Sequence, residues 1–335
     1  MGDPAASLAW VLIVTGLVSG LSVVAVLRLA RDTGMLDRPG GRASHAVPTP
    51  TGAGIGIVFS LIVGSLLASH LLDPDWVWWW MLLPGAAVLS LVGWWDDRRS
   101  LPAGWRLLIQ FLAGCLLLWG LKFSGGQLAW PWLGAWLIAV VALMNIHNFM
   151  DGSNGLAGAQ AVFSGAALAV WFHVEGASAA MLASLLVLVS YLGFLPFNTP
   201  SARIFMGDAG SVPLGFLVAA LLSVGLAHAW LPVPVAALVV AVFVIDAGLT
   251  LFKRAIRGER WYTAHKQHIY QRLIAQGWSH SRVLLCYQAI NLALVAPALV
   301  LARMYPELAW EIAGVMYLLL MTGWYRASRW LEVRT

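Results

Sequence analysis

Carboxylate, amide and imidazole side chains gather in four short polar segments of a strongly apolar chain. The segments are 94–97, 148–152, 205–211 and 265–268, and each stands at the end of a long apolar run. An ionised carboxylate in hydrocarbon is costly, so acidic residues at such places must reach water, a cation or a metal. Carboxylates combined with amides and histidines predict a metal-assisted site that handles phosphates.

The elements that must position these segments are transmembrane helices. The chain has 335 residues, of which 60% are hydrophobic and 10% are charged, whereas a soluble domain has about 25% charged residues. Its apolar runs are continuous, unlike the strands of a β-barrel, and are long enough to cross about 30 Å of hydrocarbon. We predict an all-α, polytopic membrane protein with eleven spans, at 8–28, 52–72, 76–95, 105–122, 130–147, 156–173, 177–195, 209–228, 231–252, 281–302 and 308–325.

Lysine and arginine residues divide unequally between the two faces that eleven spans create. Of the 20 such residues, only Lys122 and Arg303 follow even-numbered spans. The positive-inside rule therefore places the other connections, and with them all four polar segments, in the cytoplasm. The N-terminus is then periplasmic and the C-terminus cytoplasmic. The basic residues are scattered over separate loops, which is not the pattern of a nucleic-acid-binding patch.

Two of the polar segments have spacings that suit a metal and a phosphate. Asn148, Asp151 and Asn154 recur every third residue, so all three can line one pocket, whereas a capping turn would need one or two of them. Asp208, followed by Ala-Gly-Ser, is typical of a helix N-terminus, whose free N–H groups favour an anion such as phosphate. Asp208 is then either the N-cap or a ligand of Mg²⁺.

Two further features complete the candidate set. His265 and His268 are three residues apart, so one helical turn can point both at the same place. They form an incomplete zinc site and, with Lys266, fit better as donors to a diphosphate. Asp246 is an intramembrane carboxylate and is therefore predicted to be functional, unless it pairs with Lys253 or the arginine that follows it.

Taken in order, these segments resemble the polyprenyl-phosphate N-acetylhexosamine-1-phosphate transferase family. The family includes the phospho-N-acetylmuramoyl-pentapeptide translocase and enzymes that start O-antigen or enterobacterial common antigen synthesis. The matching residues are Arg42, His45 and Pro48-Thr49-Pro50; Asp96-Asp97; Asn145, Asn148, Asp151-Gly152 and Asn154-Gly155; Asn198 with Phe205-Met206-Gly207-Asp208; Asp246; and the 265–268 loop.

The resemblance implies a reaction and a role for each matching residue. Family members transfer a sugar 1-phosphate from a UDP-sugar to a polyprenyl phosphate and release UMP. Asp208 is then the ligand of Mg²⁺, or of Mn²⁺ in its place, with Asn154 as a second ligand. The implied catalytic residues are Asp96, Asp97, Asp151, His265 and His268, and the implied substrate-binding residues are Asn148, Arg42, His45, Lys266 and, at the uracil, Asn198 and Phe205.

The sequence departs from the family pattern at three places. Asn154 stands where many bacterial members have Asp, Tyr270-Gln271 stands where a His-His pair is common, and Arg98-Arg99-Ser100 follows the aspartate pair where a Lys is favoured. These differences favour the O-antigen-initiating branch over the peptidoglycan translocase.

The expected protein is one membrane domain, 1–335, in the bacterial inner membrane. Its active site is expected on the cytoplasmic loops 29–51, 96–104, 147–155, 196–208 and 253–280. The expected partners are a UDP-N-acetylsugar, a polyprenyl phosphate and the lipid bilayer, with no nucleic acid, and a homodimer is left open. The lipid phosphate attacks either directly or after an aspartate has carried the phospho-sugar. The alternatives are a secondary transporter that uses Asp246 as its coupling site, and a membrane scaffold, which would leave the polar segments without a purpose.

Overall fold

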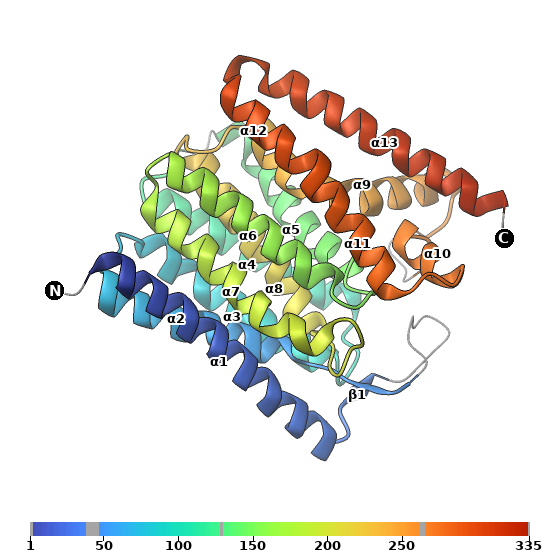
Figure 1. Cartoon of the computed structure of the whole chain (residues 1–335), viewed down its shortest axis with the longest axis horizontal. Coiled ribbons are helices and arrows are strands. Elements are labelled where there is room, and N and C mark those ends of the chain that lie inside the picture. Colours follow the sequence, from blue (N-terminus) through green and yellow to red (C-terminus); the bar gives the residue numbers. More distant parts are fainter. Residues whose placement is uncertain (1–2, 38–46, 128–129, 261–264, 334–335) are drawn as a thin grey trace.

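The computed structural model describes residues 3–37, 47–127, 130–260 and 265–333. It is a bundle of long helices with one short antiparallel strand pair, β1 Leu36–Asp37 and β2 Thr49–Pro50 (Figure 1). The α-helices are α1 Pro4–Asp32, α2 Gly54–Leu72, α3 Val77–Asp96, α4 Ala103–Phe123, α5 Leu133–Phe149, α6 Leu156–Val174, α7 Ser178–Asn198, α8 Asp208–Ala227, α9 Val233–Ile256, α10 Ile269–Ala275, α11 His280–Ile290, α12 Ala296–Met304 and α13 Ala309–Val333. Short 3₁₀ turns lie at Trp130–Trp132 and Pro306–Leu308, and a π-helical turn, Asn291–Val295, joins α11 to α12. The all-α prediction is confirmed.

Ten helical stretches of the described chain are long and apolar enough to cross a membrane. Two of them are composite, because His280–Met304 includes the π-helical turn and Pro306–Val333 includes a 3₁₀ turn. The remaining predicted span, 130–147, corresponds to α5, which has 17 residues and is shorter than the other ten. The chain enters it through the 3₁₀ turn at Trp130–Trp132, which takes up the start of the predicted range. The multi-pass prediction is confirmed, with ten long spans and one shorter apolar helix.

Helix α8 lies at the centre of the bundle. Over an 18-residue stretch of α8, 94% of the residues are buried. The helix contacts α2, α3, α4, α5, α6, α7 and α9. Such a helix must be apolar on all sides, and α8 has no charged residue after Asp208, its first residue. The only charge of this central helix therefore lies at one end of the bundle.

The loop before α8 is held against the first strand pair by backbone hydrogen bonds. The N–H of Phe205 donates to the carbonyl of Pro50 at 2.8 Å, and the N–H of Ala53 donates to the carbonyl of Phe205 at 3.1 Å. Two segments that are far apart in sequence, and that were both expected in the site, therefore lie side by side.

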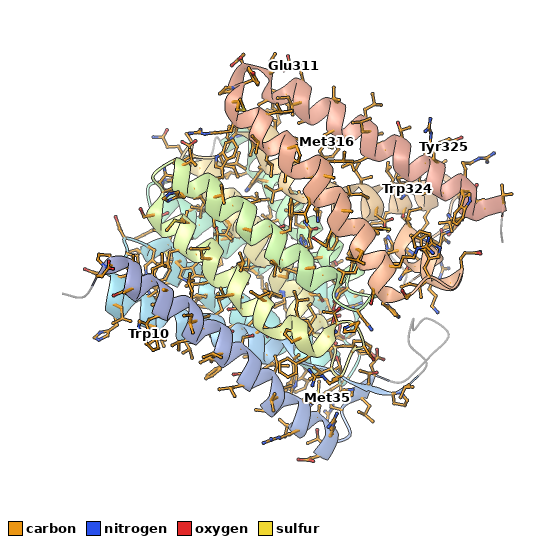
Figure 2. The ribbon with its side chains drawn as sticks, viewed as in Figure 1. Trp10, Met35, Glu311, Met316, Trp324 and Tyr325 are labelled. Carbon is orange, nitrogen blue, oxygen red and sulfur yellow. The ribbon has the colours of Figure 1, made fainter. Side chains whose placement is uncertain are left out.

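Large apolar side chains cover the outside of the bundle. Trp10 on α1 is 65% exposed and Tyr325 on α13 is 61% exposed, and both point away from the neighbouring helices (Figure 2). An exterior of this kind matches a surface that faces lipid. Polar chemistry is thereby confined to the ends of the helices and to the interior.

Candidate active site

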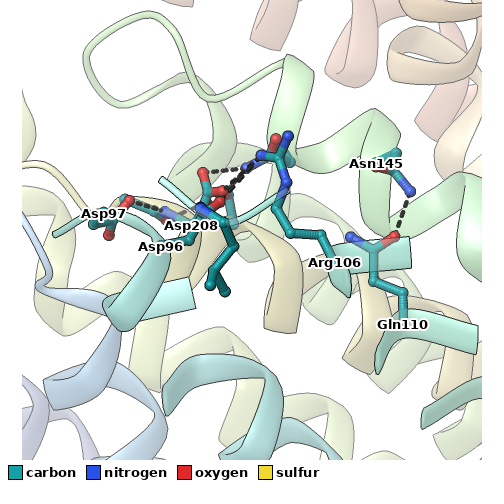
Figure 3. A network of polar contacts seen from close by, with 10 residues as sticks. Asp96, Asp97, Arg106, Gln110, Asn145 and Asp208 are labelled. Carbon is teal, nitrogen blue, oxygen red and sulfur yellow. Dashed lines mark hydrogen bonds and ion pairs between the residues drawn. The ribbon is translucent and has the colours of Figure 1, made fainter. Parts of the chain in front are cut away.

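The carboxylate of Asp97 lies at the N-terminus of α8. The backbone N–H of Asp208 donates to Asp97 Oδ1 at 3.1 Å (Figure 3). The N-cap of α8 is Gly207, with φ +66°, and a Cβ on this residue would lie 2.1 Å from Asp97 Oδ2. Only glycine permits this approach. Asp208 is thus the first helical residue rather than the N-cap, and one of the N–H groups predicted to bind a phosphate is taken by Asp97.

Two further side chains hold the carboxylates of Asp208 and Asp96. Asn148, in the last turn of α5, donates from Nδ2 to Asp208 Oδ1 at 2.6 Å and to Ser211 Oγ at 3.0 Å. Arg106, in the first turn of α4, places Nη1 3.1 Å from Asp96 Oδ2 and 3.7 Å from Asp208 Oδ2 (Figure 3). One guanidinium therefore lies between two carboxylates that come from different helices.

The carboxylates in this cluster disfavour one another's charge. Burial, and then the charges of Asp208 and Asp96, raise the pKa of Asp97 well above its usual range. Burial, and then the charges of Asp208 and Asp97, raise the pKa of Asp151 well above its usual range. Asp97 Oδ2 is buried without a hydrogen-bond partner among the described residues. A cation beside these oxygens would stabilise their ionised forms.

Mg²⁺ fits this donor set. No three His, Cys, Asp or Glu side chains within the described ranges form a metal-binding group, but Mg²⁺ is usually held by one or two carboxylates plus substrate phosphates. Asp208 and Asp97 Oδ2 are hard oxygen donors of the type that Mg²⁺ and Mn²⁺ bind. Asn154, the other predicted ligand, donates from Nδ2 to the carbonyl of Pro200 at 3.3 Å. The contacts therefore bring Asp97, rather than Asn154, to Asp208.

The histidine loop, residues 265–268, packs against the segment that carries Asp151. The ring of His268 is buried and stacks on Phe149, with ring centroids 6.2 Å apart. The centroid of the His265 ring lies 4.7 Å from that of the His268 ring. Tyr270 donates its O–H to the carbonyl of Phe149 at 2.8 Å. Burial is the main cause that lowers the pKa of His265 to about 4, and it also lowers the pKa of His268. Both rings are therefore neutral near pH 7, and each can donate one N–H.

Asp246, on α9, links the start of α10, directly after the histidine loop, to α11 and α13 through hydrogen bonds. Its side chain is buried, and Oδ1 accepts from the N–H of Ile269 at 2.9 Å and from Trp324 Nε1 at 3.3 Å, while Oδ2 accepts from the O–H of Tyr287. These donors belong to α10, α13 and α11. Lys253 pairs with a carboxylate of α13 instead of Asp246. A carboxylate surrounded by protein donors fits a positioning role better than ion coupling.

The two residues expected at the uracil lie at the two ends of the connection between α7 and α8: Asn198 is the last residue of α7, and Phe205 is in the loop before α8. Asn198 is buried, its Oδ1 accepts from the N–H of Gly155, and its Nδ2 donates to the carbonyl of Ile204 at 3.0 Å. Asn198 thus shapes the loop, and its contact with uracil stays a prediction. Phe205 is half-buried in the same loop, and Lys266 is exposed. Arg42 and His45 lie outside the described residues.

An apolar groove of about 690 Å³ opens from the carboxylate cluster between α4, α5 and α9. Its polar end is formed by Asp96, Arg106, Asn148 and Asp208, and most of its remaining lining is apolar side chains. A groove that joins an apolar wall to a few convergent polar groups fits a ligand with an apolar tail and a charged head.

Arg106 and Gln110 belong to this site and were missed by sequence reasoning. In the sequence Arg106 is one of many basic residues on the predicted cytoplasmic side. Gln110, one turn further along α4, accepts from Asn145 Nδ2 at 2.7 Å (Figure 3). A cation and an amide at i and i+4, at the start of an apolar run, share one helix face. That spacing is the signal that could have identified them.

Known proteins with similar sequences indicate the kind of protein. The model of the family described as glycosyl transferase family 4 matches residues 79–226. The chain is 28% identical over 310 residues to the probable undecaprenyl-phosphate N-acetylglucosaminyl 1-phosphate transferase of Bacillus subtilis. This alignment covers 88% of the chain and 83% of the relative.

Two further relatives match at similar levels. The chain is 26% identical over 299 residues to the undecaprenyl-phosphate alpha-N-acetylglucosaminyl 1-phosphate transferase of Escherichia coli (strain K12), which covers 82% of this chain and 78% of the relative. It is 28% identical over 291 residues to the phospho-N-acetylmuramoyl-pentapeptide-transferase of Lactiplantibacillus plantarum, which covers 78% of this chain and 88% of the relative.

The fold is that of a multi-pass membrane protein, and the similar sequences support a sugar-phosphate transferase. More narrowly, the relatives confirm the predicted resemblance to the polyprenyl-phosphate N-acetylhexosamine-1-phosphate transferases.

Proposed function

We propose that the chain transfers N-acetylhexosamine 1-phosphate from a UDP-sugar to undecaprenyl phosphate, or another polyprenyl phosphate, and releases UMP. The observation that carries this proposal is the groove that joins an apolar wall to the carboxylate cluster. A polyprenyl phosphate has the matching division, since its tail is apolar and its head is a phosphate. The product, a lipid-diphosphate-sugar, would initiate O-antigen or other cell-envelope polysaccharide synthesis at the cytoplasmic face of the bacterial inner membrane.

Asp208 and Asp97 are the residues that would hold Mg²⁺, or Mn²⁺ in its place. When bound, the ion would supply positive charge that lowers the repulsion between the two phosphate groups of the reaction. The hydrogen bond from the N–H of Asp208 keeps Asp97 Oδ1 at the helix end, so Oδ2 is the oxygen that would be available to the cation. Arg106 holds Asp96 beside Asp208 and offers further N–H donors to an anionic head group.

The lipid phosphate needs little help from a base. A phosphate monoester has its second pKa near 6, so this group is largely dianionic at neutral pH. Any remaining proton would pass to Asp97, the carboxylate that the resemblance assigns to catalysis. His265, His268 and Lys266 would donate to the diphosphate of the UDP-sugar, with both imidazoles neutral.

The test is transfer by the purified full chain with undecaprenyl phosphate, Mg²⁺ and a panel of radiolabelled UDP-N-acetylsugars, with UDP-glucose as the control donor. We expect label in the lipid fraction from an N-acetylsugar, together with an equal amount of UMP. Release of UDP instead would indicate transfer of the sugar without its phosphate. Absence of lipid-linked label with every donor would contradict the proposal.

A further inference from the structure

A second polar cavity lies between α9, α13 and the segment that leads into α10. It has a volume of about 160 Å³, and its lining includes Lys253, Arg257, Arg272, Trp324, Ser328 and Glu332. It shares no lining residue with the groove at the carboxylate cluster. The proposed transfer reaction assigns it no role.

Positive charge is in excess in this cavity. Lys253 pairs with Glu332 and donates from Nζ to Ser328 Oγ at 2.9 Å, while Arg257 Nη2 lies 3.4 Å from Glu332 Oε1. Arg272 donates from Nη1 to Ser328 Oγ at 3.2 Å. Three cations against one carboxylate leave two positive charges. Cations held this close together repel one another unless an anion joins them.

The cavity lies near the C-terminal ends of two membrane-length helices. Lys253 is in the last turn of α9, and Ser328 is in the last two turns of α13. Trp324 lies on the side of α13 that faces α9, with Lys253 Nζ 5.8 Å from its ring, whereas Tyr325 points away from the bundle (Figure 2). Tryptophan and lysine at the ends of spanning helices mark the depth of the lipid head groups.

We propose that this cavity binds the phosphate group of an anionic membrane phospholipid. Basic pockets between transmembrane helices bind such head groups, and guanidinium and ammonium groups make strong, charge-assisted hydrogen bonds to phosphate oxygens. A soluble phosphate has the same chemistry. The position of the cavity between the ends of two spanning helices favours the lipid, because the bilayer presents its phosphates at this depth.

An occupied cavity would also steady the histidine loop, a consequence that rests on the proposed function. Gln267 lines the cavity and lies within the 265–268 loop. Trp324, from the same lining, donates to Asp246, which in turn accepts from the N–H of Ile269 next to His268. A head group held by Arg272 would thus restrain the histidine loop on both sides of His268, at Gln267 and at Ile269.

The test is the binding of single phospholipids to the purified full chain in detergent, counted by native mass spectrometry. We expect phosphatidylglycerol to bind with defined stoichiometry and phosphatidylcholine not to compete with it. Arg257→Gln and Arg272→Gln should each weaken phosphatidylglycerol binding about five-fold, the equivalent of ~1 kcal/mol per cation near a membrane surface. Arg326→Gln, which removes an exposed cation from α13 outside the cavity, is the matched control and should bind like the wild type.

Equal binding of the two lipids, or equal weakening in the Arg326→Gln control, would overturn the proposal. Inorganic phosphate is tested separately through the thermal unfolding midpoint. If it stabilises the wild type as much as phosphatidylglycerol does, and Arg257→Gln abolishes the effect, the ligand is a soluble anion and the lipid assignment is wrong. Neither readout uses a UDP-sugar, so failure of the transfer reaction would not be mistaken for failure of this site.

Discussion

Asp97 and Asp208 meet at the start of the central helix, where the N–H of Asp208 donates to Asp97 Oδ1 at 3.1 Å although the two residues are 111 positions apart in the sequence. The contact joins the end of α3 to the beginning of α8. It aims one oxygen of Asp97 at the helix and leaves the other buried without a partner among the described residues. The proposed cation site depends on this pairing.

Arg106 should control both the activity and the affinity for the cation. Arg106→Gln removes the positive charge between Asp96 and Asp208, so we expect transfer to fall on the order of 100-fold. Mg²⁺ should bind more tightly, because the carboxylates lose a competing cation. Initial rates and Mg²⁺ titrations check both effects. Arg99→Gln, an exposed arginine at the same end of the bundle, should change neither, and weaker Mg²⁺ binding in Arg106→Gln would contradict the account.

Asp246 should act on the reaction through the histidine loop. Asp246→Ala leaves the N–H of Ile269, the indole of Trp324 and the O–H of Tyr287 without their acceptor, which should lower the free energy of unfolding by about 3 kcal/mol. Asp246→Asn keeps one acceptor oxygen and should restore part of the stability and of kcat. Hydrogen exchange at the α10 amides should rise in both variants. Unchanged exchange there would show that Asp246 does not position the loop.

The histidine loop should lose stability in acid. Burial, and then the charge of His268, lower the pKa of His265 from 6.5 to about 4, so between these values the unfolded chain binds a proton that the folded chain does not. Stability therefore rises with pH in this window. The contribution is complete above about pH 6.5 and is lost as the pH falls toward 4. Hydrogen-exchange protection of the loop should follow this course in the wild type and flatten in His265→Gln. The same slope in both proteins would contradict it.

The orientation can be tested with single cysteines in a chain whose own Cys115 and Cys286 are replaced. Ser100→Cys, beside the aspartate pair and exposed, should react with a membrane-impermeant maleimide only from the cytoplasmic side. Glu307→Cys, in the exposed turn between α12 and α13, should react only from the periplasmic side. Labelling of Ser100→Cys from the periplasm alone would reverse the predicted topology.

The helices were predictable because a long apolar run in a bilayer must satisfy its backbone internally. The meeting of Asp96, Asp97, Asn148 and Asp208 was also predictable. Successive spans cross the membrane in alternating directions, so these residues stand at helix ends on the same face of the membrane. The length of α5 was not, because the 3₁₀ turn at Trp130–Trp132 lies within an equally apolar run.

Individual contacts were less predictable, because they join elements that are remote in sequence. Arg106 lies among many basic residues, and only the fold places it between two carboxylates. Asp246 has the expected burial, but three of its donors come from three later helices. Asn154 has the spacing of a site residue, yet its side chain donates a hydrogen bond to the carbonyl of Pro200.

The central claim is that Asp208 carries Mg²⁺-dependent transfer. The most direct measurement is the transfer rate of Asp208→Asn across a Mg²⁺ titration, with Asn154→Ala as the comparison and the thermal unfolding midpoint as the check on folding. Asp208→Asn keeps the volume and one acceptor oxygen for Asn148 but loses the charge. We predict a loss of transfer on the order of 1,000-fold, an unfolding midpoint that no longer responds to Mg²⁺, and a smaller loss in Asn154→Ala. Transfer by folded Asp208→Asn at the wild-type rate and with the wild-type Mg²⁺ dependence would contradict the account.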